Sequence, residues 1–315
     1  MMATLPKTQT LALDFEQGWL TVWFNQPERR NPLTDEAVED LATVIASIKD
    51  QRDIRGMTIR GKGGFFCAGG DLKGFNAMAS GATDESMRMS RRIGHVLAEL
   101  NALPQVTVAV IEGAAMAGGL GVACCCDVTV GMHDAKFGFS ETRIGITPAQ
   151  IARYVLQKCG YSTGRRLMLT AARFKGEEAG RLGVLDFVAM DTAELEQIEK
   201  RVKQDVLECA PGAVAACKAL IIGMPQTPDE DKVEFAATNF SDCLQGDEGK
   251  ETGTQRGRRN RADAVDQHGA AHGIAISGGL GAFDVLQRAE QVEEPHWHDH
   301  PKPGHQLAAG LPQGP

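Results

Sequence analysis

Residues 106–121 have the sequence VTVAVIEGAAMAGGLG, in which an almost unbroken apolar run leads into a glycine-rich segment. A run without polar alternation, such as residues 106–111, is typical of a parallel strand that is covered on both faces. The glycines that follow predict a tight turn, and the small residues from Gly118 onward predict a helix. The stretch therefore predicts a strand, a turn and a helix of an α/β fold.

A second strand and a second glycine-rich turn precede this stretch. Residues 57–71, MTIRGKGGFFCAGGD, form a short strand-like run that ends in glycines. Because parallel strands end at the same edge of a sheet, both turns present backbone N–H groups there. Two such groups can stabilise one developing oxyanion, and the start of a helix adds its dipole. Either turn alone is more often a tight turn without a function, so the pair is what indicates a site.

The rest of the body alternates strands and helices before it becomes purely helical. Alternating and aromatic runs at 11–16 and 19–24 predict a β-hairpin, and Thr34 predicts the cap of a helix. Further segments carry the pattern of strands near 128–130 and 137–139, and of helices at 192–209, 213–222 and 232–244. This order predicts an α/β core with a helical C-terminal part.

The sequence divides into three parts. Residues 1–190 are the expected α/β core, and residues 191–251 are the expected helical region. Residues 252–315 differ in composition: they are rich in Arg, Gly and His and show no sustained hydrophobic periodicity, and six of the eight histidines lie there. We expect this tail to be disordered, or of the kind that a shifted reading frame or a fusion produces, and we assign no function to it.

Composition and charge exclude several classes of protein. With 43% hydrophobic and 23% charged residues, the 315-residue chain is neither collagen-like nor fully disordered. A net charge of −8 predicts no binding to nucleic acid, and no run reaches the roughly 18 apolar residues of a membrane span. The first residues lack the pattern of a signal peptide, so we expect a cytoplasmic protein. The eight cysteines form no CxxC pair, which predicts reduced, buried thiols and no metal site.

Three motifs taken together closely resemble the crotonase superfamily, the enoyl-CoA hydratases and isomerases. They are FCAGGDLK at 66–73, GAAMAGGLG at 113–121 and FGFSETRIGITP at 137–148. The loop NQPERRNPL at 25–33 and the turn AGRLGVLD at 179–186 are similar to further segments of that family. The resemblance covers about residues 8 to 250 in the family's order.

This resemblance implies roles for individual residues. The backbone N–H groups of Ala68 and Gly118 match the oxyanion hole for the thioester carbonyl, and Glu141 matches the second of the family's two catalytic glutamates. The first of those glutamates falls on Gly121, which has no side chain. Contacts with CoA or the substrate are expected at Arg30, Cys67, Gly69, Asp71, Lys73, Gly119, Gly121 and Arg143.

The resemblance also implies a fold and an assembly. The expected fold is a crotonase-like ββα superhelix with two roughly perpendicular sheets and a helical C-terminal region that forms trimers or dimers of trimers. The expected substrate is an acyl-CoA thioester. Coenzyme A enters only as part of that substrate, and we expect no metal or redox cofactor.

The glycine at position 121 bears on the reaction. Hydration of a 2-enoyl-CoA needs a group that activates water and a proton for C2, and one carboxylate must perform both tasks in turn. A single base suits the transfer of a proton between C2 and C4, so a Δ3,Δ2-enoyl-CoA isomerase that uses Glu141 is the alternative to a hydratase. A catalytically weak acyl-CoA-binding protein is a second alternative.

Residues 140–152 favour the hydratase. They are similar to a branch that hydrates branched glutaconyl-CoA thioesters, such as isohexenylglutaconyl-CoA in the breakdown of acyclic terpenes. In such a substrate Arg143 would have a carboxylate to bind, although a surface arginine is the simpler interpretation.

Three other features carry weaker hypotheses. Cys67 is expected to be a packed thiol rather than a nucleophile, because no base lies near it in the sequence. The histidines at 296–305 lie in the predicted tail, where no organised metal site is expected. The arginines at 256–261 are too few, in an acidic chain, to indicate nucleic-acid binding.

Overall fold

The computed structural model of the chain describes residues 5–70 and 83–251. These residues lie in the first of two compact units, Met1–Thr252 and Gly253–Pro315. Two predicted contact residues, Asp71 and Lys73, lie outside the described residues, as does the predicted tail at 252–315.

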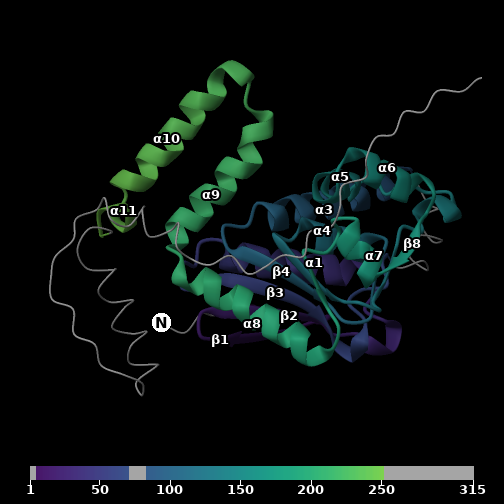
Figure 1. Ribbon diagram of the computed structural model, residues 1–315. Helices are drawn as coiled ribbons and strands as arrows, with labels where there is room; N and C mark the ends of the chain where they lie inside the picture. Colours follow the sequence, from purple (N-terminus) through teal and green to yellow (C-terminus); the bar gives the residue numbers. More distant parts are fainter. Residues whose placement is uncertain (1–4, 71–82, 252–315) are drawn as a thin grey trace, which may run out of the picture. The chain divides into compact units, whose positions relative to one another are not determined.

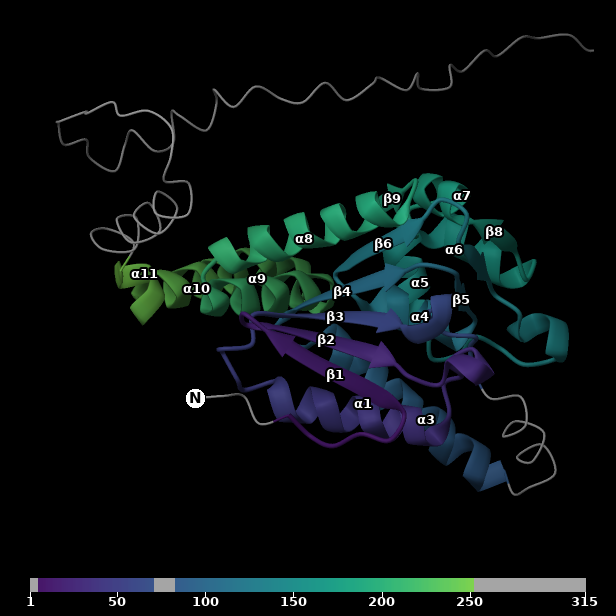
Figure 2. The same ribbon diagram turned by 90° about the horizontal axis from the view of Figure 1, so that it is seen from below.

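Six strands form the main sheet, in the order β1-β2-β3-β4-β6-β9 (Figure 2). The predicted hairpin is confirmed: β1 and β2 are antiparallel, whereas every other neighbouring pair is parallel. Because β2, β3 and β4 run in the same direction, the turns that follow β3 and β4 lie at one edge of the sheet. The six strands are β1 (Leu11–Glu16), β2 (Trp19–Phe24), β3 (Gly56–Gly61), β4 (Val106–Ile111), β6 (Val128–Met132) and β9 (Phe187–Ala189).

A second sheet has three strands in the order β5-β7-β8. The strand β5 (Ala114–Met116) pairs in parallel with β7 (Lys136–Gly138), which pairs antiparallel with β8 (Arg173–Lys175). The expected two-sheet architecture is therefore confirmed. The sequence predicts a turn where β5 lies, because the three residues Ala-Ala-Met between a glycine and a helix carry no strand pattern of their own. Pairing with β7 makes this segment a strand.

Helices cover both faces of the main sheet, which explains the apolar run of β4 (Figure 1). On one face Val108 and Val110 pack with Leu195 of α8. On the other face Ala109 and Ile111 join the larger core that α1, α3 and α4 complete. Alternate residues of β4 are thus buried against opposite layers. The helices of the two layers are α1 (Asp35–Ile48), α3 (Thr83–Asn101), α4 (Gly118–Cys125) and α8 (Thr192–Glu208).

The first helix begins where the sequence predicts it. The Thr34 hydroxyl accepts a hydrogen bond of 3.2 Å from the N–H of Ala37, so it caps α1. The guanidinium of Arg92, on α3, donates two hydrogen bonds of 2.6 Å to the carboxylate of Glu39, on α1. These bonds connect the two helices and lower the pKa of Glu39.

The remaining helices are shorter or lie in the C-terminal region. They are α5 (Ala152–Cys159), α6 (Tyr161–Leu169), α7 (Gly176–Arg181), α9 (Pro211–Gly223), α10 (Lys232–Gln245) and α11 (Asp247–Glu251). Short 3-10 turns occur at η1 (Pro27–Arg29), η2 (Lys62–Gly64), η3 (Glu141–Ile144), η4 (Met224–Gln226) and η5 (Asp229–Asp231). The predicted helices at 213–222 and 232–244 are confirmed by α9 and α10.

The helices α9 and α10 run antiparallel to one another (Figure 1). Lys218 of α9 attaches the pair to the sheet, because its Nζ donates to the carbonyls of Leu103 and Gln105 at 2.8 and 2.9 Å. The same Nζ lies 2.6 Å from a carboxylate oxygen of Asp127. Within residues 5–70 and 83–251, no single helix is long and apolar enough to cross a membrane. Only α8 and the segment Pro211–Gln226, bent by 104° at their junction, reach that length and hydropathy as a pair.

Candidate active site

Short backbone pairings gather the segments that follow β3 and β4. Cys67 pairs with Ala115, and Met116 pairs with Gly138. The turn after β3, the approach to α4 and the end of β7 therefore lie side by side. A few residues further on, these three segments reach Gly70, Gly118 and Glu141.

The backbone of Gly118 lies beside the backbone nitrogen of Gly70 at this junction. A Cβ on Gly118 would lie 3.8 Å from the backbone nitrogen of Gly70, and both residues are partly exposed. Gly118 is the first residue of α4, so its N–H has no partner within the helix and lies at the positive end of the helix dipole. The N–H of Gly70 donates to no other residue that the structure describes. Two such donors can bind one carbonyl oxygen.

The prediction that Ala68 supplies one of these donors is wrong. Its N–H donates to the carbonyl of Arg30 at 3.0 Å, with the carbonyl of Asn31 at 3.4 Å. This N–H therefore connects the turn to the loop at 25–33 and is not free for a ligand. Gly70, two residues later, has the donor that lies beside Gly118.

The residue before Gly118 has a strained backbone. Ala117 has φ of +47° and ψ of −120°, a conformation that residues with a side chain rarely adopt. A hydrogen bond of 2.8 Å from its N–H to the carbonyl of Gly138 holds it there. Gly69 leaves room beside it, because a Cβ on Gly69 would lie 3.0 Å from the Cβ of Ala117. The surrounding turns thus fix the direction in which α4 begins.

Glu141 brings a buried carboxylate to the same region. It is the first residue of η3 and is 7% exposed. Its Oε2 atom is buried without a hydrogen-bond partner among the described residues. Burial raises the pKa of this carboxyl, although hydrogen bonds from the N–H groups of Glu141 and Ser140 oppose the shift. A carboxyl with a raised pKa and an unpaired oxygen is suited to accept and return a proton.

Four residues that we expected to contact the substrate are instead buried behind the site: Cys67, Gly69, Gly119 and Gly121. Cys67 is fully buried, and a Cβ on Gly119 would lie 2.6 Å from its own Cβ. Burial also raises the pKa of the Cys67 thiol to about 12, so the thiol stays protonated. The structure corrects the expectation of contact, because these residues allow the turns to pack closely. It agrees with a packed Cys67.

An apolar side chain fills the space beside Gly121. A Cβ on this residue would lie 2.0 Å from Cγ2 of Ile151, which is 4% exposed. No side chain fits at position 121 unless Ile151 moves. The position that matches the family's first glutamate therefore lacks a carboxylate, and the packed Ile151 side chain leaves no space for one.

Asn31 is a structural residue of the site that sequence reasoning missed. Its Oδ1 accepts a hydrogen bond of 2.8 Å from the N–H of Gln26, and its Nδ2 donates to the carbonyls of Lys62 and Phe65 at 3.0 and 2.6 Å. The residue is buried and has φ of +54°, which asparagine tolerates better than most residues. It thereby joins the loop at 25–33 to the turn after β3. The sequence signal that could have indicated this role is the Asn itself, which stands between Arg30 and Pro32 in a loop and is a residue type that tolerates a positive φ.

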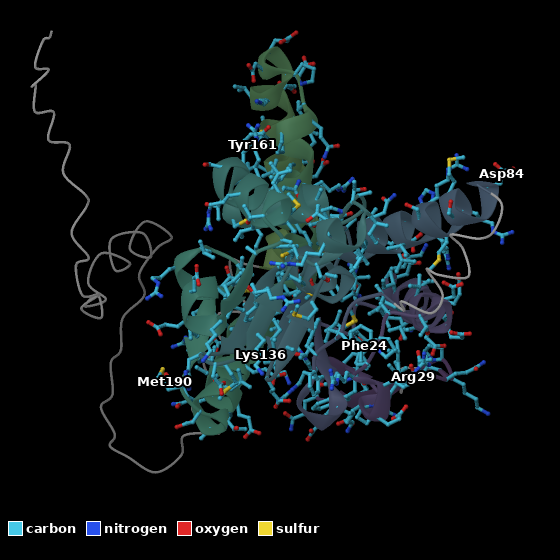
Figure 3. All side chains as sticks on the ribbon, turned by 90° about the vertical axis from the view of Figure 1, so that its right-hand side faces the viewer. Phe24, Arg29, Asp84, Lys136, Tyr161 and Met190 are labelled. Atoms are coloured by element: carbon cyan, nitrogen blue, oxygen red, sulfur yellow. The ribbon has the colours of Figure 1, made fainter. Side chains whose placement is uncertain are left out.

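Arg30 remains available to a ligand at this loop. Its side chain is exposed, and its guanidinium carbon lies 5.5 Å from the centre of the Phe65 ring. Figure 3 shows the side chains and labels Arg29 on this loop, Phe24 at the end of β2 and Lys136 at the start of β7. A cation here suits a phosphate-bearing ligand.

Arg143 is placed differently from the prediction. It lies in η3 next to Glu141, but its Nη2 donates to the carbonyl of Ala171 at 3.1 Å. The residue is exposed, and its Nε also donates to the carbonyl of Ala171, at 3.4 Å, in the turn that follows α6. The structure therefore corrects the expectation that Arg143 points to a substrate carboxylate.

A buried charge cluster lies at the base of the two turns. The guanidinium of Arg60, near the end of β3, donates to Glu112 at 2.5 Å and to Glu199 of α8 at 3.0 Å. Glu112 follows β4 directly, so this ion pair spans the ends of both strands. Glu199 also accepts from the Thr58 hydroxyl at 2.9 Å and lies 2.7 Å from Nζ of Lys203. The cluster holds the strand ends from which the site turns begin.

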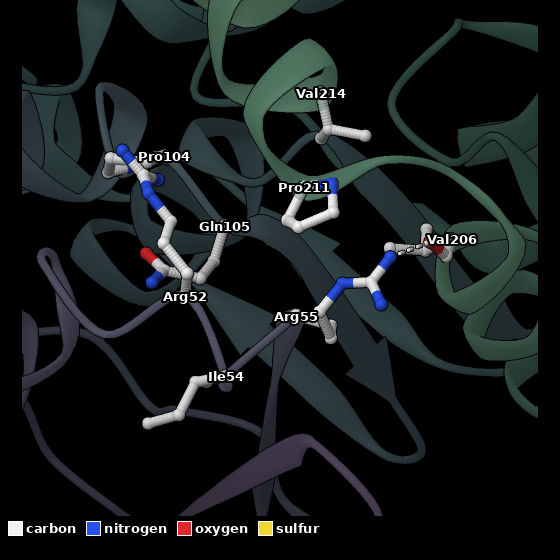
Figure 4. A pocket seen from close by; sticks show the side chains of 8 residues that line it. All are labelled: Arg52, Ile54, Arg55, Pro104, Gln105, Val206, Pro211 and Val214. Atoms are coloured by element: carbon white, nitrogen blue, oxygen red, sulfur yellow. Dashed lines mark hydrogen bonds between the residues drawn. The ribbon is translucent and has the colours of Figure 1, made fainter. Parts of the chain in front are cut away.

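A separate cavity lies at the opposite, amino-terminal ends of β3 and β4 (Figure 4). Its volume is about 10 Å³, which is room for one water molecule at most. Arg55 beside it donates to the carbonyls of Val206 and Leu207 at 3.3 Å, at the end of α8. This cavity is therefore too small for an organic ligand. Within the described ranges, no group of three or more His, Cys, Asp or Glu side chains could hold a metal ion.

Comparison with known protein families gives one match over most of the chain. The family described as "Enoyl-CoA hydratase/isomerase" matches residues 14–260. The match ends a few residues inside the region that the sequence predicts as an atypical tail.

Individual proteins agree with this match. The chain is 30% identical over 246 residues to "Enoyl-CoA hydratase AFT6-1" of Alternaria alternata, which covers 78% of this chain and 80% of that protein. Among solved structures, Pseudomonas aeruginosa AtuE superposes with a TM-score of 0.75 at 40% identity, covering 77% of this chain and 94% of its own. An enoyl-CoA hydratase/isomerase from Marinobacter aquaeolei has a TM-score of 0.75 at 33% identity, covering 81% of this chain and 97% of its own.

Proposed function

The chain belongs to the enoyl-CoA hydratase/isomerase family, and from this premise we propose that it is a hydratase that adds water to a 2-enoyl-CoA thioester. Members of the family act on acyl-CoA substrates. The relatives named enoyl-CoA hydratase support the reaction, and the exposed cation at Arg30 supports binding of the CoA phosphates.

The oxyanion hole of the proposed enzyme consists of the N–H groups of Gly70 and Gly118. Both donate to the thioester oxygen, which gains negative charge when the carbonyl conjugates with the reacting double bond. A preorganised donor of this kind typically contributes about 2.7–4 kcal/mol to transition-state stabilisation. The strained turn at Ala117 keeps the Gly118 donor in place before substrate binds.

Glu141 is the acid and base of the proposed reaction. Its carboxylate accepts a proton from water while the water oxygen forms a bond to C3 and the π electrons move toward the thioester oxygen. The carboxylic acid so formed returns a proton to C2 as the enolate collapses. One carboxylate therefore serves both steps in turn, and the net change is the addition of one water.

The observation that carries this proposal is the buried, unpaired Oε2 of Glu141 in the same region as the paired donors Gly70 and Gly118. A buried carboxylate oxygen without a partner destabilises a fold, so it needs a functional reason. Proton transfer at an acyl-CoA supplies that reason. Hydration adds one water without net oxidation or reduction, and Glu141 carries both proton transfers, so we propose that no metal or redox cofactor takes part.

The second candidate function is a Δ3,Δ2-enoyl-CoA isomerase. The packing of Ile151 against Gly121 favours it, because it leaves Glu141 without a second carboxylate at the matching position. In that reaction Glu141 removes a proton from C2 and returns it to C4. A branched glutaconyl-CoA substrate gains no support from Arg143, whose guanidinium bonds to Ala171.

Self-association through the helical region is part of the proposal. The helix α9, PGAVAACKALIIG, is almost wholly apolar, yet none of its residues is buried. On α10, Val233, Phe240 and Leu244 are also exposed. Exposed apolar surface of this kind marks an interaction site. We expect other copies of the chain to cover it in a trimer or a dimer of trimers.

A panel of thioesters tests the proposal. The protein is mixed separately with straight and branched 2-enoyl-CoA and 3-enoyl-CoA esters, and the products are followed by mass and by the position of the double bond. A hydratase gives a product heavier by one water from a 2-enoyl-CoA. A shifted double bond without a change in mass indicates the isomerase, and binding without turnover indicates an acyl-CoA-binding protein.

A further inference from the structure

Two glycines on different helices each leave room for one of two consecutive side chains. A Cβ on Gly94, in α3, would lie 2.3 Å from Oε1 of Gln150, and a Cβ on Gly121, in α4, would lie 2.0 Å from Cγ2 of Ile151. Neither glycine has a positive φ, so backbone conformation does not require a glycine at either place. Each position instead needs a glycine because of packing. The side chain of Gln150 fills the space beside Gly94, and that of Ile151 fills the space beside Gly121; we call these two spaces sockets.

Further contacts fix both side chains in their sockets. The Nε2 of Gln150 donates to the Ser90 hydroxyl of α3 at 2.8 Å. Ile151 is 4% exposed, and its carbonyl accepts hydrogen bonds from Tyr154 and Val155 at 3.0 and 3.1 Å, where α5 begins. Residues 150 and 151 are therefore anchored to α3 and α4 while they also start α5.

These anchors end the segment that begins with Glu141. At the start of that segment, the N–H of Ile146 donates to the carbonyl of Glu141 at 3.1 Å, which closes the turn after η3. From there the chain runs to Gln150 and Ile151. The socket at Gly121 lies one helical turn after Gly118. Ile151 thus connects the segment carrying the carboxylate to the helix whose first N–H belongs to the oxyanion hole.

We propose that Gln150 and Ile151 are positioning residues that hold the Glu141 turn in register with the Gly118 donor. This role rests on the proposed function, because it matters only if Glu141 exchanges protons with a substrate bound at Gly118. The absence of a side chain at Gly121 then has a structural purpose. Position 121 leaves space for the side chain of Ile151. A glutamate at this position would displace Ile151, and Ile151 is the residue that we propose to hold the Glu141 segment in place.

A double-mutant cycle tests the polar anchor. Gly94→Ala places a methyl group where the Gln150 side chain lies, and Gln150→Ala removes that side chain. We expect each single change to lower kcat by roughly ten- to hundredfold while KM changes little, since displacement of a catalytic group has effects of this size. Because both changes remove the same anchor, the double variant is expected to be no slower than the slower single variant. If the loss of kcat in the double variant equalled the product of the two single losses, Gly94 and Gln150 would act independently, and the proposed anchor would be overturned.

The apolar anchor is tested with Ile151→Ala and with a matched core control. Ile48→Ala removes the same atoms from α1 at an equally buried position, so it reports the effect of lost stability alone. We expect Ile151→Ala, but not Ile48→Ala, to lower kcat and to move the acid limb of the pH–rate profile to lower pH, because a displaced Glu141 becomes more solvated. Ile151→Val, which keeps most of the side chain, is expected to restore most of kcat.

The outcome separates this role from the proposed function. A loss of activity in Glu141→Gln together with wild-type kcat and pH profile in Gln150→Ala and Ile151→Ala would overturn the positioning role alone. Wild-type turnover in Glu141→Gln would overturn the assignment of the base and the positioning role with it.

Discussion

The backbone nitrogen of Gly70 lies 3.8 Å from the point that a Cβ on Gly118 would occupy. A methyl group at that point would lie beside the two N–H groups that we propose to bind the thioester oxygen, and would obstruct the approach of that oxygen. Space around the methyl is otherwise available, because its closest neighbour would be Cδ2 of Leu33 at 3.4 Å, the end of a flexible side chain.

Gly118→Ala is therefore expected to block the oxyanion hole without unfolding the protein. Loss of oxyanion stabilisation predicts a fall in kcat/KM of about 10²–10³-fold, with little change in Tm. The comparison variant is Gly121→Ala, in which the new Cβ would collide with Ile151. We expect this variant, unlike Gly118→Ala, to have a clearly lower Tm than the wild type. Steady-state kinetics and thermal unfolding of both variants check this contrast. Wild-type kcat/KM in Gly118→Ala would exclude this position from the hole.

The buried carboxyl of Glu141 gives stability a dependence on pH. Burial raises its pKa in the folded protein, so the ionised form destabilises the fold at pH values above that folded pKa. The cost disappears as pH falls below the pKa of the unfolded chain, about 4.3 for a glutamate. Glu141→Gln removes the cost, so we expect the variant to unfold at higher denaturant than the wild type at neutral pH. The difference should shrink as the pH is lowered, and a constant difference would contradict the prediction.

The ion cluster around Arg60 is expected to be sensitive to the loss of one partner. Arg60→Met leaves the carboxylate of Glu199, which is 4% exposed, with less compensation, and the typical cost of breaking such a buried pair is about 3–5 kcal/mol. The double variant Arg60→Met/Glu199→Gln removes both charges and should recover part of that loss. Denaturant unfolding of the two variants measures the difference. Equal stability of Arg60→Met and the wild type would show that the cluster does not hold the strand ends.

The exposed apolar residues of α10 predict self-association. We expect light scattering after gel filtration to give a mass of three or six chains for the wild type. Phe240→Glu, which places a charge on an apolar residue that is 68% exposed, should reduce that mass. A control substitution at Glu230, in the exposed turn η5, should leave the mass unchanged. A wild-type protein that is a monomer at all concentrations would contradict the proposed assembly.

The elements with strong local patterns were predictable from the sequence. The apolar run of β4, the hairpin of β1 and β2 and the cap at Thr34 all depend on residues close together in the chain. The strand β5 was not predictable, because only its pairing with β7 makes it a strand.

The candidate site was predictable to the level of its turns but not of its atoms. The glycine-rich turns and Glu141 could be identified from the motifs. Which N–H of the first turn is free depends on the bond from Ala68 to Arg30, and the packing of Ile151 against Gly121 joins segments 30 residues apart. Contacts across such separations depend on how the helices pack, and a local pattern does not contain that information.

The measurement that tests the central claim most directly is the turnover of a 2-enoyl-CoA by Glu141→Gln. Glutamine keeps the size of the side chain but cannot accept the proton of the attacking water. We predict a loss of kcat of about 10²–10⁴-fold, the usual contribution of a general acid–base group, while binding of an unreactive acyl-CoA keeps its wild-type affinity. Formation of the hydrated product at the wild-type rate would contradict the account, because Glu141 would then not be the group that moves the protons.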